Sequence, residues 1–383
     1  MTEKLFDDGE LLTFVGTVVS CTENGKFYDI VLDRTAFFPE GGGQTGDTGK
    51  LCDVCVMDTV EIGGEVVHKC DKPLEVGEAV CGRIDKDQRL RKMQNHSGEH
   101  LLMGFIHAKL GYDNIGFHLG SREVTLDLNG VISAKDLLYC EQAANEAIAR
   151  DVPITISYPD SAALEKLEYR SKLEMTENVR IVTIEGIDSC ACCAPHVSST
   201  GKIGIIKVIS SENYKGGTRL HILCGLDALD LFRQRLESTY AISKLLSAKP
   251  EKIAEQTERL LSENILLKRQ LADIERRKAE DIISSLEDHT DESFCIFTSG
   301  LSADTMRSIA NEAVKHTNKA VGVFCENSSG HSYIIASQTL PLRSLAKQLN
   351  TTLGGKGGGS DQMIQGSLTA EREVIENYFC NDL

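Results

Sequence analysis

Two short segments of this chain carry residue types that bind transition metals. The first is His96-Ser97-Gly98-Glu99-His100, and the second is Cys192-Cys193-Ala194-Pro195-His196. Imidazoles four residues apart lie on one face of a helix, and a thiolate with a third imidazole completes a tetrahedral set that suits zinc. If the fold joins the two segments, they form a zinc site. The chemistry that such a site predicts is hydrolysis by a metal-activated water.

The first segment alone also permits another function. The pattern H-x-x-E-H is the inverted signature of zinc peptidases, in which Glu99 would be the general base. Such a peptidase needs a further carboxylate ligand, whereas the later group here is Cys192 with His196, which favours a soft-ligand zinc site. Glu99 is then an ordinary residue of the first helical turn or a partner of a ligand histidine.

The second segment has alternatives of its own. Cys190, Cys192 and Cys193 lie in one stretch and can be inert core thiols. A purely structural zinc site also stays open, because four protein ligands normally mark a closed site.

Composition limits the classes of protein that this chain can belong to. Its 383 residues suggest two to four domains, and its formal charge of −16 argues against non-specific nucleic-acid binding. A local basic track remains possible, and the positions expected to form it are Arg89, Arg91, Lys92, Lys215 and Arg219. The odd count of 13 cysteines, with no leader and no membrane-spanning segment in the sequence, indicates free thiols and a cytoplasmic location.

The sequence pattern predicts the elements that must position these residues. Together they indicate an α+β protein with four parts. Short strands with Gly-rich turns over residues 1–87 indicate a small β-barrel. Residues 88–225 alternate helices and strands and are expected to form an α+β sandwich that contains the zinc site. Residues 226–287 read as a helical hairpin or coiled-coil segment, with Pro250 opening its second helix, and residues 288–383 as an α/β domain.

A heptad repeat marks the second of these helices. Ile253, Leu260, Leu267 and Ile274 recur every seven residues, and Asn264 occupies an alternate position that can set the register. The repeat is barely long enough for an independent coiled coil. Packing on its own chain and a dimer seam are therefore equally open.

Two glycine-rich clusters can approach a ligand closely. Gly41-Gly42-Gly43-Gln44 lets the backbone come near a ligand, Gln44 adds a donor and an acceptor, and Thr35 offers a hydroxyl to a small substrate. The run Gly354-Gly355-Lys356-Gly357-Gly358-Gly359 is either an anion cradle or a plain flexible turn, and its spacing alone favours the turn.

Together these motifs resemble those of the alanyl-tRNA editing proteins called AlaX, and of the editing half of alanyl-tRNA synthetase. The barrel cluster is similar to the family's T-x-F-[FY]-P-x-x-G-G-Q, and the metal segments to its H-x-x-x-H and C-x-x-x-H-V. A G-x-x-R strand follows, and the last glycine run resembles the DHHA1 domain. The matching positions are Thr35, Phe37, Phe38, Pro39, Gly42, Gly43, Gln44, His96, His100, Cys192, His196, Val197, Thr200, Ile203, Gly204, Gly216 and Arg219.

The resemblance implies a long-form AlaX protein that hydrolyses the ester of mischarged Ser-tRNA(Ala), and of Gly-tRNA(Ala), with zinc held by His96, His100, Cys192 and His196. In this assignment Thr35 and Gln44 are catalytic. The substrate-binding residues are Gly42, Gly43, Arg219 and Lys356. The partners implied are tRNA(Ala) and a second copy of the chain, through the helical segment or the last domain. The alternatives are an inverted-motif zinc peptidase and a non-enzymatic tRNA-binding protein with a structural zinc.

Two departures from the family pattern affect these expectations. The synthetase usually has Gly-Gly-Thr between its cysteine and histidine ligands, where this chain has Cys193-Ala194-Pro195. The ligand spacing is kept, but the backbone is stiffer and one thiol is added. Because the sequence begins at the barrel motif, with no class II aminoacylation domain before it, ATP-dependent charging is not expected.

Overall fold

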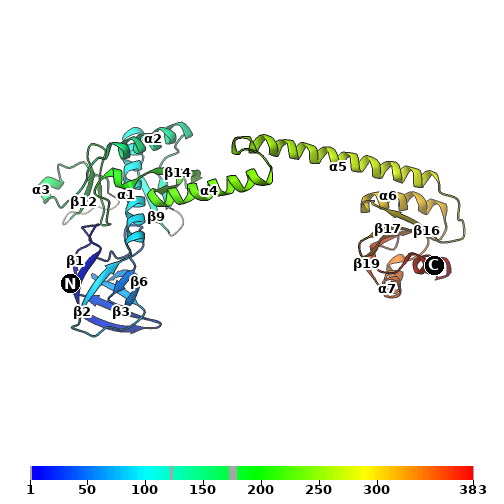
Figure 1. The fold of residues 1–383 in the computed structure, drawn as a ribbon, viewed down its shortest axis with the longest axis horizontal. Helices are drawn as coiled ribbons and strands as arrows, with labels where there is room; N and C mark the ends of the chain where they lie inside the picture. Colours follow the sequence, from blue (N-terminus) through cyan, green and yellow to red (C-terminus); the bar gives the residue numbers. More distant parts are fainter. Residues whose placement is uncertain (1, 121–123, 172–178, 383) are drawn as a thin grey trace. The chain divides into compact units, whose positions relative to one another are not determined.

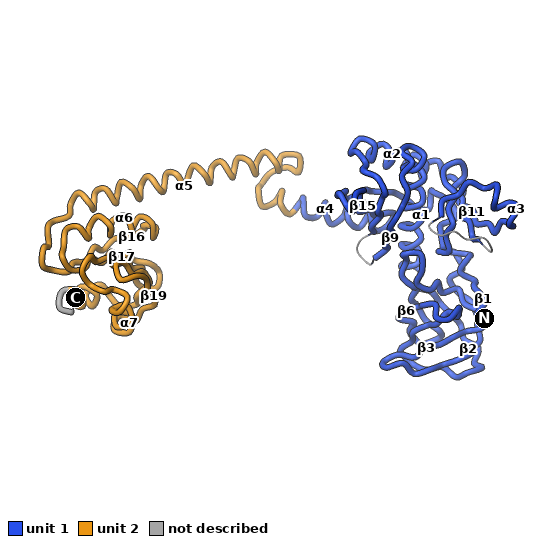
Figure 2. The backbone as a smooth tube through the Cα atoms, turned by 180° about the vertical axis from the view of Figure 1, so that it is seen from behind, with its two compact units in different colours: residues 1–240 blue, residues 241–383 orange. Residues whose placement is uncertain are grey.

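The computed structural model describes residues 2–120, 124–171 and 179–382. The chain divides into two compact units, Met1–Tyr240 and Ala241–Leu383 (Figure 2). The predicted barrel and sandwich therefore share one unit, while the finer division into four domains stays a prediction. No helix among the described residues is long and apolar enough to cross a membrane.

The first unit begins with a closed barrel, as predicted (Figure 1). Alternate residues of its strands point inward, so that Phe14, Leu32 and Leu51 are buried together. Strands β1 and β4 form a separate parallel pair. The barrel order is β2-β3-β7-β6-β5-β8, and the bounds are β1 (Glu3–Lys4), β2 (Thr13–Asn24), β3 (Phe27–Leu32), β4 (Arg34–Thr35), β5 (Gly49–Leu51), β6 (Val54–Ile62), β7 (Glu65–Cys70) and β8 (Ala79–Ile84).

Helix α1 (Lys86–Leu110) leaves the barrel and runs through the rest of the unit (Figure 1). Asp85 caps its N-terminus by accepting from the backbone of Asp87 and Gln88, and Gly111, with φ 67°, ends it. Its middle part is buried although many of its side chains are polar. Such burial requires partners for each of these polar groups, and it places the first metal segment in the interior.

Two sheets and helix α2 pack against α1. A four-stranded sheet has the order β14-β15-β10-β9 and a three-stranded sheet the order β11-β12-β13. The apolar sides of α1, α2 and these sheets share one core, which includes Leu101, Leu126 and Ile222. The elements are β9 (Asn114–Leu119), β10 (Val124–Leu128), α2 (Ala134–Arg150), β11 (Ile154–Ser157), α3 (Ser161–Leu164), β12 (Ile181–Ile184), β13 (Asp188–Ala191), the 3₁₀ turn η1 (Thr200–Ile203), β14 (Ile206–Tyr214) and β15 (Gly217–Cys224).

The second unit is a five-stranded sheet of order β16-β17-β18-β20-β19 with helices on both faces. Val321 and Val323 of β17 pack with α5 and α6 on one face, whereas Phe324 packs with α7 and α8 on the other. The elements are β16 (Phe294–Ser299), α6 (Ala303–Ala313), η3 (Val314–His316), β17 (Ala320–Asn327), β18 (Gly330–Ser337), α7 (Leu342–Thr352), β19 (Gly355–Gly359), β20 (Met363–Leu368) and α8 (Arg372–Asp382).

The predicted helical segment consists of α4 (Gly225–Leu245), the short turn η2 (Pro250–Lys252) and α5 (Ile253–Ser284). Pro250 stands at the start of the turn that leads into α5, as the sequence predicts. Along α5 the heptad residues Leu260, Leu267 and Ile274 are exposed by 55%, 62% and 62%. Their pairing with another helix, as a hairpin or as a dimer seam, stays a prediction.

Candidate metal centre

The fold brings the two predicted metal segments together. His96 and His100 on α1 meet Cys192 and His196 of the loop after β13, and one possible ligand atom from each residue lies within 4.8 Å of all the others. Cys192 Sγ is 3.5 Å from His96 Nε2 and 3.3 Å from His196 Nε2. The three histidines are almost fully buried. Three imidazoles and one thiolate in this arrangement fit a zinc ion by their chemistry.

Two of the imidazoles are oriented by hydrogen bonds on their outer nitrogens. Gln44 Oε1 lies 2.9 Å from His96 Nδ1, and Ser97 Oγ lies 3.0 Å from His196 Nδ1. When both Nδ1 atoms carry the proton, each Nε2 presents its lone pair toward Cys192. Such outer partners fix the tautomer of a ligand histidine.

Carboxylates flank the third imidazole on both nitrogens. His100 Nδ1 is 3.8 Å from Asp188 Oδ2, and His100 Nε2 is 3.8 Å from Glu99 Oε2. Asp188 also accepts two hydrogen bonds from the Arg170 guanidinium, at 2.7 and 2.6 Å. Gly104, one helical turn after His100, allows this approach, because a Cβ there would lie 2.9 Å from Asp188 Cβ.

Electrostatics in the cluster favours the ligand protonation states of Cys192 and His196, and a positive charge at His100. Burial alone would raise the pKa of the Cys192 thiol, but the neighbouring His96 and His196 hold it well below its ordinary value. Burial lowers the pKa of His196 to about 3, so this imidazole is neutral at pH 7. The pKa of His100 is raised despite its burial, because Cys190 and Asp188 favour a cation there. A bound metal ion would supply that positive charge.

The loop that carries Cys192 is held by Arg180. Arg180 Nη1 donates to the carbonyl oxygens of Cys192 at 2.7 Å and Ala194 at 2.9 Å, and its Nε is 2.9 Å from Asp7 Oδ1. These contacts bracket Cys193, the position where the chain departs from the family pattern. The thiol ligand is therefore presented by a clamped loop.

The barrel motif reaches the metal cluster through its glycine turn. Gly43 has φ 86°, and a Cβ there would lie 2.3 Å from the carbonyl oxygen of Phe117, so only glycine fits. A Cβ on Gly42 would lie 3.8 Å from Cys193 Sγ, which puts the turn beside the second metal segment. Gln44, which follows, is fully buried, and its Nε2 has no hydrogen-bond partner among the described residues.

Thr35 lies in the barrel interior with its hydroxyl already engaged. It is fully buried, its Oγ1 is 2.9 Å from His68 Nε2, and it accepts from the Phe37 amide at 3.1 Å. A threonine hydroxyl has one donor and two acceptor sites, so these two bonds leave at most one acceptor site for a substrate hydroxyl. That predicted contact stays a prediction.

The predicted basic track does not exist as a set of free cations. Arg89 is fully buried against Asp47, and Lys92 donates to the carbonyl oxygen of Gly46. Arg91 pairs with Asp227 and Asp230. These three side chains form ion pairs or hydrogen bonds within the first unit, because the fold brings acceptors from distant segments to them.

Arg219 and Lys215 belong to the hairpin of β14 and β15 rather than to the metal cluster. Arg219 makes two hydrogen bonds to Asp127, at 2.6 and 2.8 Å, and its guanidinium lies 3.7 Å from the centre of the Tyr214 ring. Lys215 Nζ lies 5.0 Å from the centre of the same ring. A substrate-binding role for Arg219 stays a prediction.

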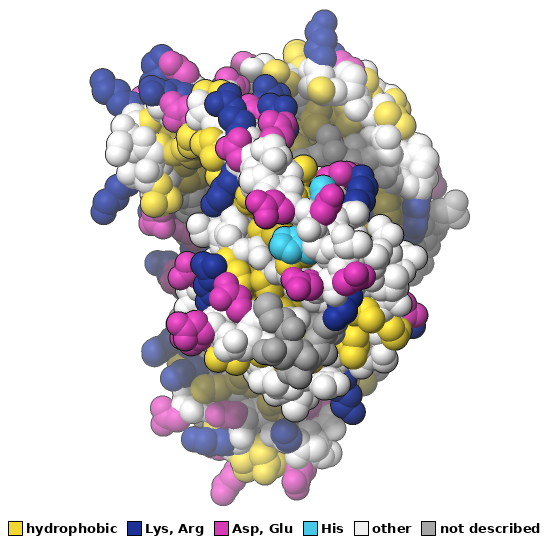
Figure 3. Space-filling view, turned by 90° about the vertical axis from the view of Figure 1, so that its right-hand side faces the viewer, with side chains coloured by type: hydrophobic (Ala, Val, Ile, Leu, Met, Phe, Trp, Pro, Cys, Tyr) yellow, Lys and Arg dark blue, Asp and Glu magenta, His cyan; other side chains and the backbone are white. Residues whose placement is uncertain are grey.

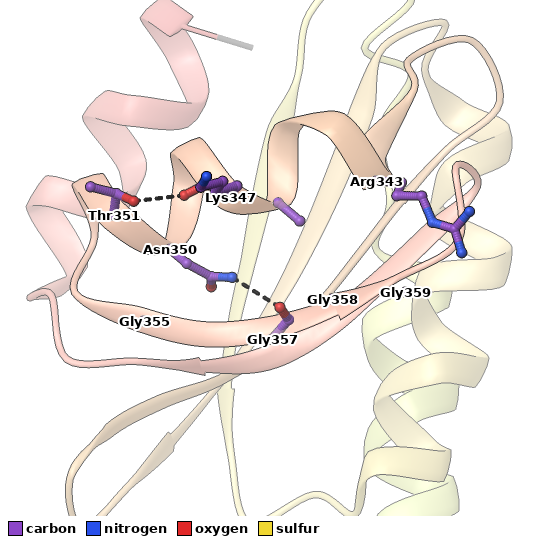
Figure 4. Close-up of a pocket in the computed structure, with 9 residues that line it drawn as sticks. Arg343, Lys347, Asn350, Thr351, Gly355, Gly357, Gly358 and Gly359 are labelled. Atoms are coloured by element: carbon purple, nitrogen blue, oxygen red, sulfur yellow. Dashed lines mark hydrogen bonds between the residues drawn. The ribbon is translucent and has the colours of Figure 1, made fainter.

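The last glycine run forms strand β19 in the second unit, whereas a turn or loop was expected. A groove lies between this strand and α7 (Figure 4). Lys356, predicted to bind substrate, is not among the residues that line this groove. The groove is lined by Arg343, Ala346, Lys347, Asn350, Thr351, Gly355, Gly357, Gly358 and Gly359.

Sequence reasoning named only one of the partners of the metal segments in advance, Glu99, which was expected as a possible partner of a ligand histidine. Ser97 lies inside the same segment and could have been named from its position. Arg170 and Asn114 carry no local signal, because their role depends on contacts across the fold. For Asp188 the only signal in the sequence is that it lies four residues before Cys192.

Three family models match parts of this chain. "tRNA synthetases class II (A)" matches residues 4–88, "Threonyl and Alanyl tRNA synthetase second additional domain" matches residues 179–221, and "DHHA1 domain" matches residues 291–377. The second match contains Cys192 and His196. The fold and these matches define a protein related to the editing and terminal parts of alanyl-tRNA synthetase, as the sequence motifs predicted.

Two individual relatives are alanyl-tRNA editing proteins that match this chain along most of their length. The chain is 26% identical to alanyl-tRNA editing protein AlaX-L of Pyrococcus horikoshii over 98% of this chain and 96% of that protein. It is 27% identical to alanyl-tRNA editing protein Aarsd1 of Mus musculus, over 93% and 91%. The predicted resemblance to long-form AlaX editing proteins is confirmed along essentially the whole chain.

The synthetases themselves are longer than this chain. It is 31% identical to the alanine–tRNA ligase of Pyrococcus abyssi over 91% of this chain but only 40% of that protein. The chain thus spans about two fifths of the length of the alanine–tRNA ligases it matches.

Proposed function

We propose that this protein is a trans-editing deacylase, which hydrolyses the ester of Ser-tRNA(Ala) and, as a second substrate, Gly-tRNA(Ala). The observation that carries the proposal is the cluster of His96, His100, Cys192 and His196 in a chain that resembles alanyl-tRNA editing proteins. A synthetase pocket discriminates weakly against an isostere or a smaller side chain, so a second hydrolytic site is needed to remove such errors.

In this proposal the four clustered residues hold a zinc ion. When bound, zinc supplies a Lewis acid and lowers the pKa of water. The chain's own residues prepare the ligands: Gln44 and Ser97 hold the outer nitrogens of His96 and His196, and Asp188 faces His100. The buried setting excludes bulk water from the ligands.

The substrate side of the site would be the barrel turn. The backbone of Gly42 and Gly43 would hold the aminoacyl-adenosine end, and Gln44 Nε2 is a buried donor with no hydrogen-bond partner among the described residues. We assign Gln44 the role of donating to the substrate while its Oε1 orients His96. Thr35 keeps its proposed role toward a seryl hydroxyl as an acceptor, through the lone pair that its bonds to His68 and Phe37 leave.

The remaining partners are tRNA(Ala) and a second copy of the chain. Contact with tRNA cannot rest on Arg89, Arg91 and Lys92, which are paired or buried. Arg219 and Lys356 keep their proposed roles at the hairpin and at β19. Over the face seen in Figure 3, acidic and basic side chains are interspersed. A role in editing charged tRNA would place the protein in the cytoplasm.

A second function is favoured by the ligand count. Four protein ligands within reach of one ion are typical of a closed structural site, whereas catalytic zinc more often has three and a water. A non-enzymatic tRNA-binding protein with structural zinc would show the same cluster. Catalysis requires an open or exchangeable position on the ion.

Deacylation of defined aminoacyl-tRNAs tests the proposal. Zinc-loaded protein is expected to hydrolyse Ser-tRNA(Ala) faster than Ala-tRNA(Ala), with Gly-tRNA(Ala) as the third substrate. Cys192→Ser should lose zinc and reduce the rate at least about 100-fold, because one ligand of the ion is replaced. Cys52→Ser, which changes an exposed thiol on the barrel, is the matched control and should keep both.

Two results would contradict the assignment. Tight tRNA binding with zinc bound and no hydrolysis of any of the three esters would favour the structural alternative. Full activity of Cys192→Ser would show that the ligand set is wrong.

A further inference from the structure

Glu99 is a buried carboxylate beside the metal cluster that the proposed function does not yet use. It is 3% exposed and lies on α1 directly before His100. Its Oε1 accepts a hydrogen bond from Asn114 Nδ2 at 2.5 Å, and its Oε2 lies 3.8 Å from His100 Nε2. One oxygen is therefore fixed by an amide, and the other faces the ligand set.

The two carboxylates around His100 differ in their charge balance. Asp188 is neutralised by two hydrogen bonds from Arg170. Glu99, in the part of the chain that the structure describes, forms no ion pair with a lysine or arginine within 4.0 Å. The ionisable side chain that Glu99 faces is His100, a candidate metal ligand, so its charge is directed at the ligand set.

The position of Glu99 relative to the histidines suits a proton acceptor. In zinc peptidases of the H-x-x-E-H type, the residue before the second histidine is the general base. This chain has the same spacing, but its remaining ligand candidates are Cys192 and His196 rather than a carboxylate. Glu99 therefore occupies the position of the base in the peptidase motif, although the other ligand candidates do not match a peptidase.

We propose that Glu99 is the catalytic base of ester hydrolysis in this site, an inference that rests on the proposed deacylase function. Glu99 takes a proton from a water whose oxygen bonds to the ester carbonyl carbon. The bond from that carbon to the ribose oxygen then breaks. The proton passes from Glu99 to the ribose oxygen, which leaves as the terminal hydroxyl of the tRNA, while the amino acid leaves as its carboxylic acid.

Asn114 has a supporting place in this proposal. Its amide holds Oε1, so that Oε2 is the oxygen that faces His100 and is available to a water. Asn114 is the first residue of β9, whose last residue, Leu119, forms a bridge with Gln44. The base and Gln44 are thus positioned by one strand.

The test is the Glu99→Gln variant of the full chain, assayed on Ser-tRNA(Ala) with zinc content, kcat and KM measured together. We expect kcat to fall by about 10²- to 10⁴-fold, while KM and zinc content stay within about two-fold, because the amide keeps the shape but accepts no proton. The matched control is Glu141→Gln, which changes a buried carboxylate on α2 that accepts from Lys207 and the Val208 amide. It should retain wild-type kcat and zinc.

The possible outcomes distinguish the assignment of Glu99 as the base from the proposed deacylase function. Wild-type kcat in Glu99→Gln, or loss of zinc from that variant, would overturn the base assignment while leaving the deacylase intact. A wild-type protein that hydrolyses none of the esters would overturn the deacylase itself. If Glu99→Gln does not fold, Glu99→Asp replaces it: a reduced kcat at unchanged zinc content supports the base, and an unchanged kcat refutes it.

Discussion

At the residue scale, the three clustered imidazoles have three different kinds of partner. His96 faces an amide oxygen of Gln44, His196 faces the hydroxyl of Ser97, and His100 lies between two carboxylates. The spacing of the histidines could be read from the sequence, because i and i+4 share a helix face. Their partners could not, because Gln44 and Asp188 reach α1 from other segments of the chain.

Asp188→Asn should weaken metal binding without unfolding the unit. The change removes the negative charge that faces His100 and leaves Arg170 with a weaker partner, so we expect the zinc dissociation constant to rise about 10- to 100-fold. Competition with a chromophoric chelator measures this. Asp127→Asn breaks a similar two-bond pair with Arg219 on the hairpin side and should leave zinc affinity unchanged. Equal loss of affinity in both variants would indicate a general folding effect.

At the element scale, the barrel contains a hydrogen-bonded chain that the sequence did not reveal. The Phe37 amide donates to Thr35 Oγ1, Thr35 donates to His68 Nε2, and His68 Nδ1 donates to the carbonyl oxygen of Ile30. The short strands and glycine turns were enough to predict a barrel. That a histidine fills its interior depends on strand register, in which His68 of β7 lies opposite Ile30 of β3.

This buried histidine makes barrel stability depend on pH. Burial lowers the pKa of His68 to about 4, whereas in the unfolded chain it is near 6.5. As the pH falls below about 6.5, His68 is protonated in the unfolded chain but stays neutral in the folded protein. The free energy of unfolding therefore decreases until about pH 4, where the folded state also binds the proton. The linkage predicts a loss of about 2 kcal/mol between pH 7.5 and pH 5 from this group.

His68→Gln isolates the effect, because all other histidines remain in both proteins. The variant should be less stable than wild type at pH 7.5, and the difference in free energy of unfolding should shrink by about 2 kcal/mol at pH 5. Urea unfolding followed by circular dichroism at the two pH values checks this. A difference that is the same at both pH values would show that His68 is not kept neutral by burial.

At the scale of the whole molecule, an exposed apolar row on α5 is the feature that an isolated chain leaves unexplained. Leu260, Leu267 and Ile274 repeat on one side of the helix, and Leu271 beside them is 55% exposed. Acidic and basic residues are mixed along α5, because Asp273, Glu275, Glu280 and Asp281 lie among the basic residues of its second half. A second copy of α5 packed on this row would bury its apolar side chains.

We therefore expect the protein to be a dimer at micromolar concentration, and Leu260→Asp with Leu267→Asp to make it monomeric, because two charges would enter the apolar seam. Sedimentation velocity measures the state. Ser262→Asp with Arg269→Asp puts charges at the same spacing on the other side of α5 and should leave the dimer intact. A wild-type monomer, or a dimer that survives the leucine changes, would contradict the seam.

The sequence by itself determined the features that depend on neighbours along the chain. The ligand spacing in His96–His100 and Cys192–His196, the strands of the barrel, the start of α5 near Pro250 and its heptad row all follow from local periodicity and residue type. The order of the motifs also sufficed for the resemblance to alanyl-tRNA editing proteins.

Only the tertiary structure decided which polar side chains are free. Arg89, Arg91 and Arg219 look like a basic surface in the sequence, but Asp47, Asp227 and Asp127 neutralise them from 42, 136 and 92 residues away. The sequence allows Glu99 to be an ordinary helical residue or a partner of a ligand histidine, and the fold decides for a position beside His100, with Asn114 as its hydrogen-bond partner. A charge is used or left free according to what lies across the fold, and one-dimensional spacing contains no such information.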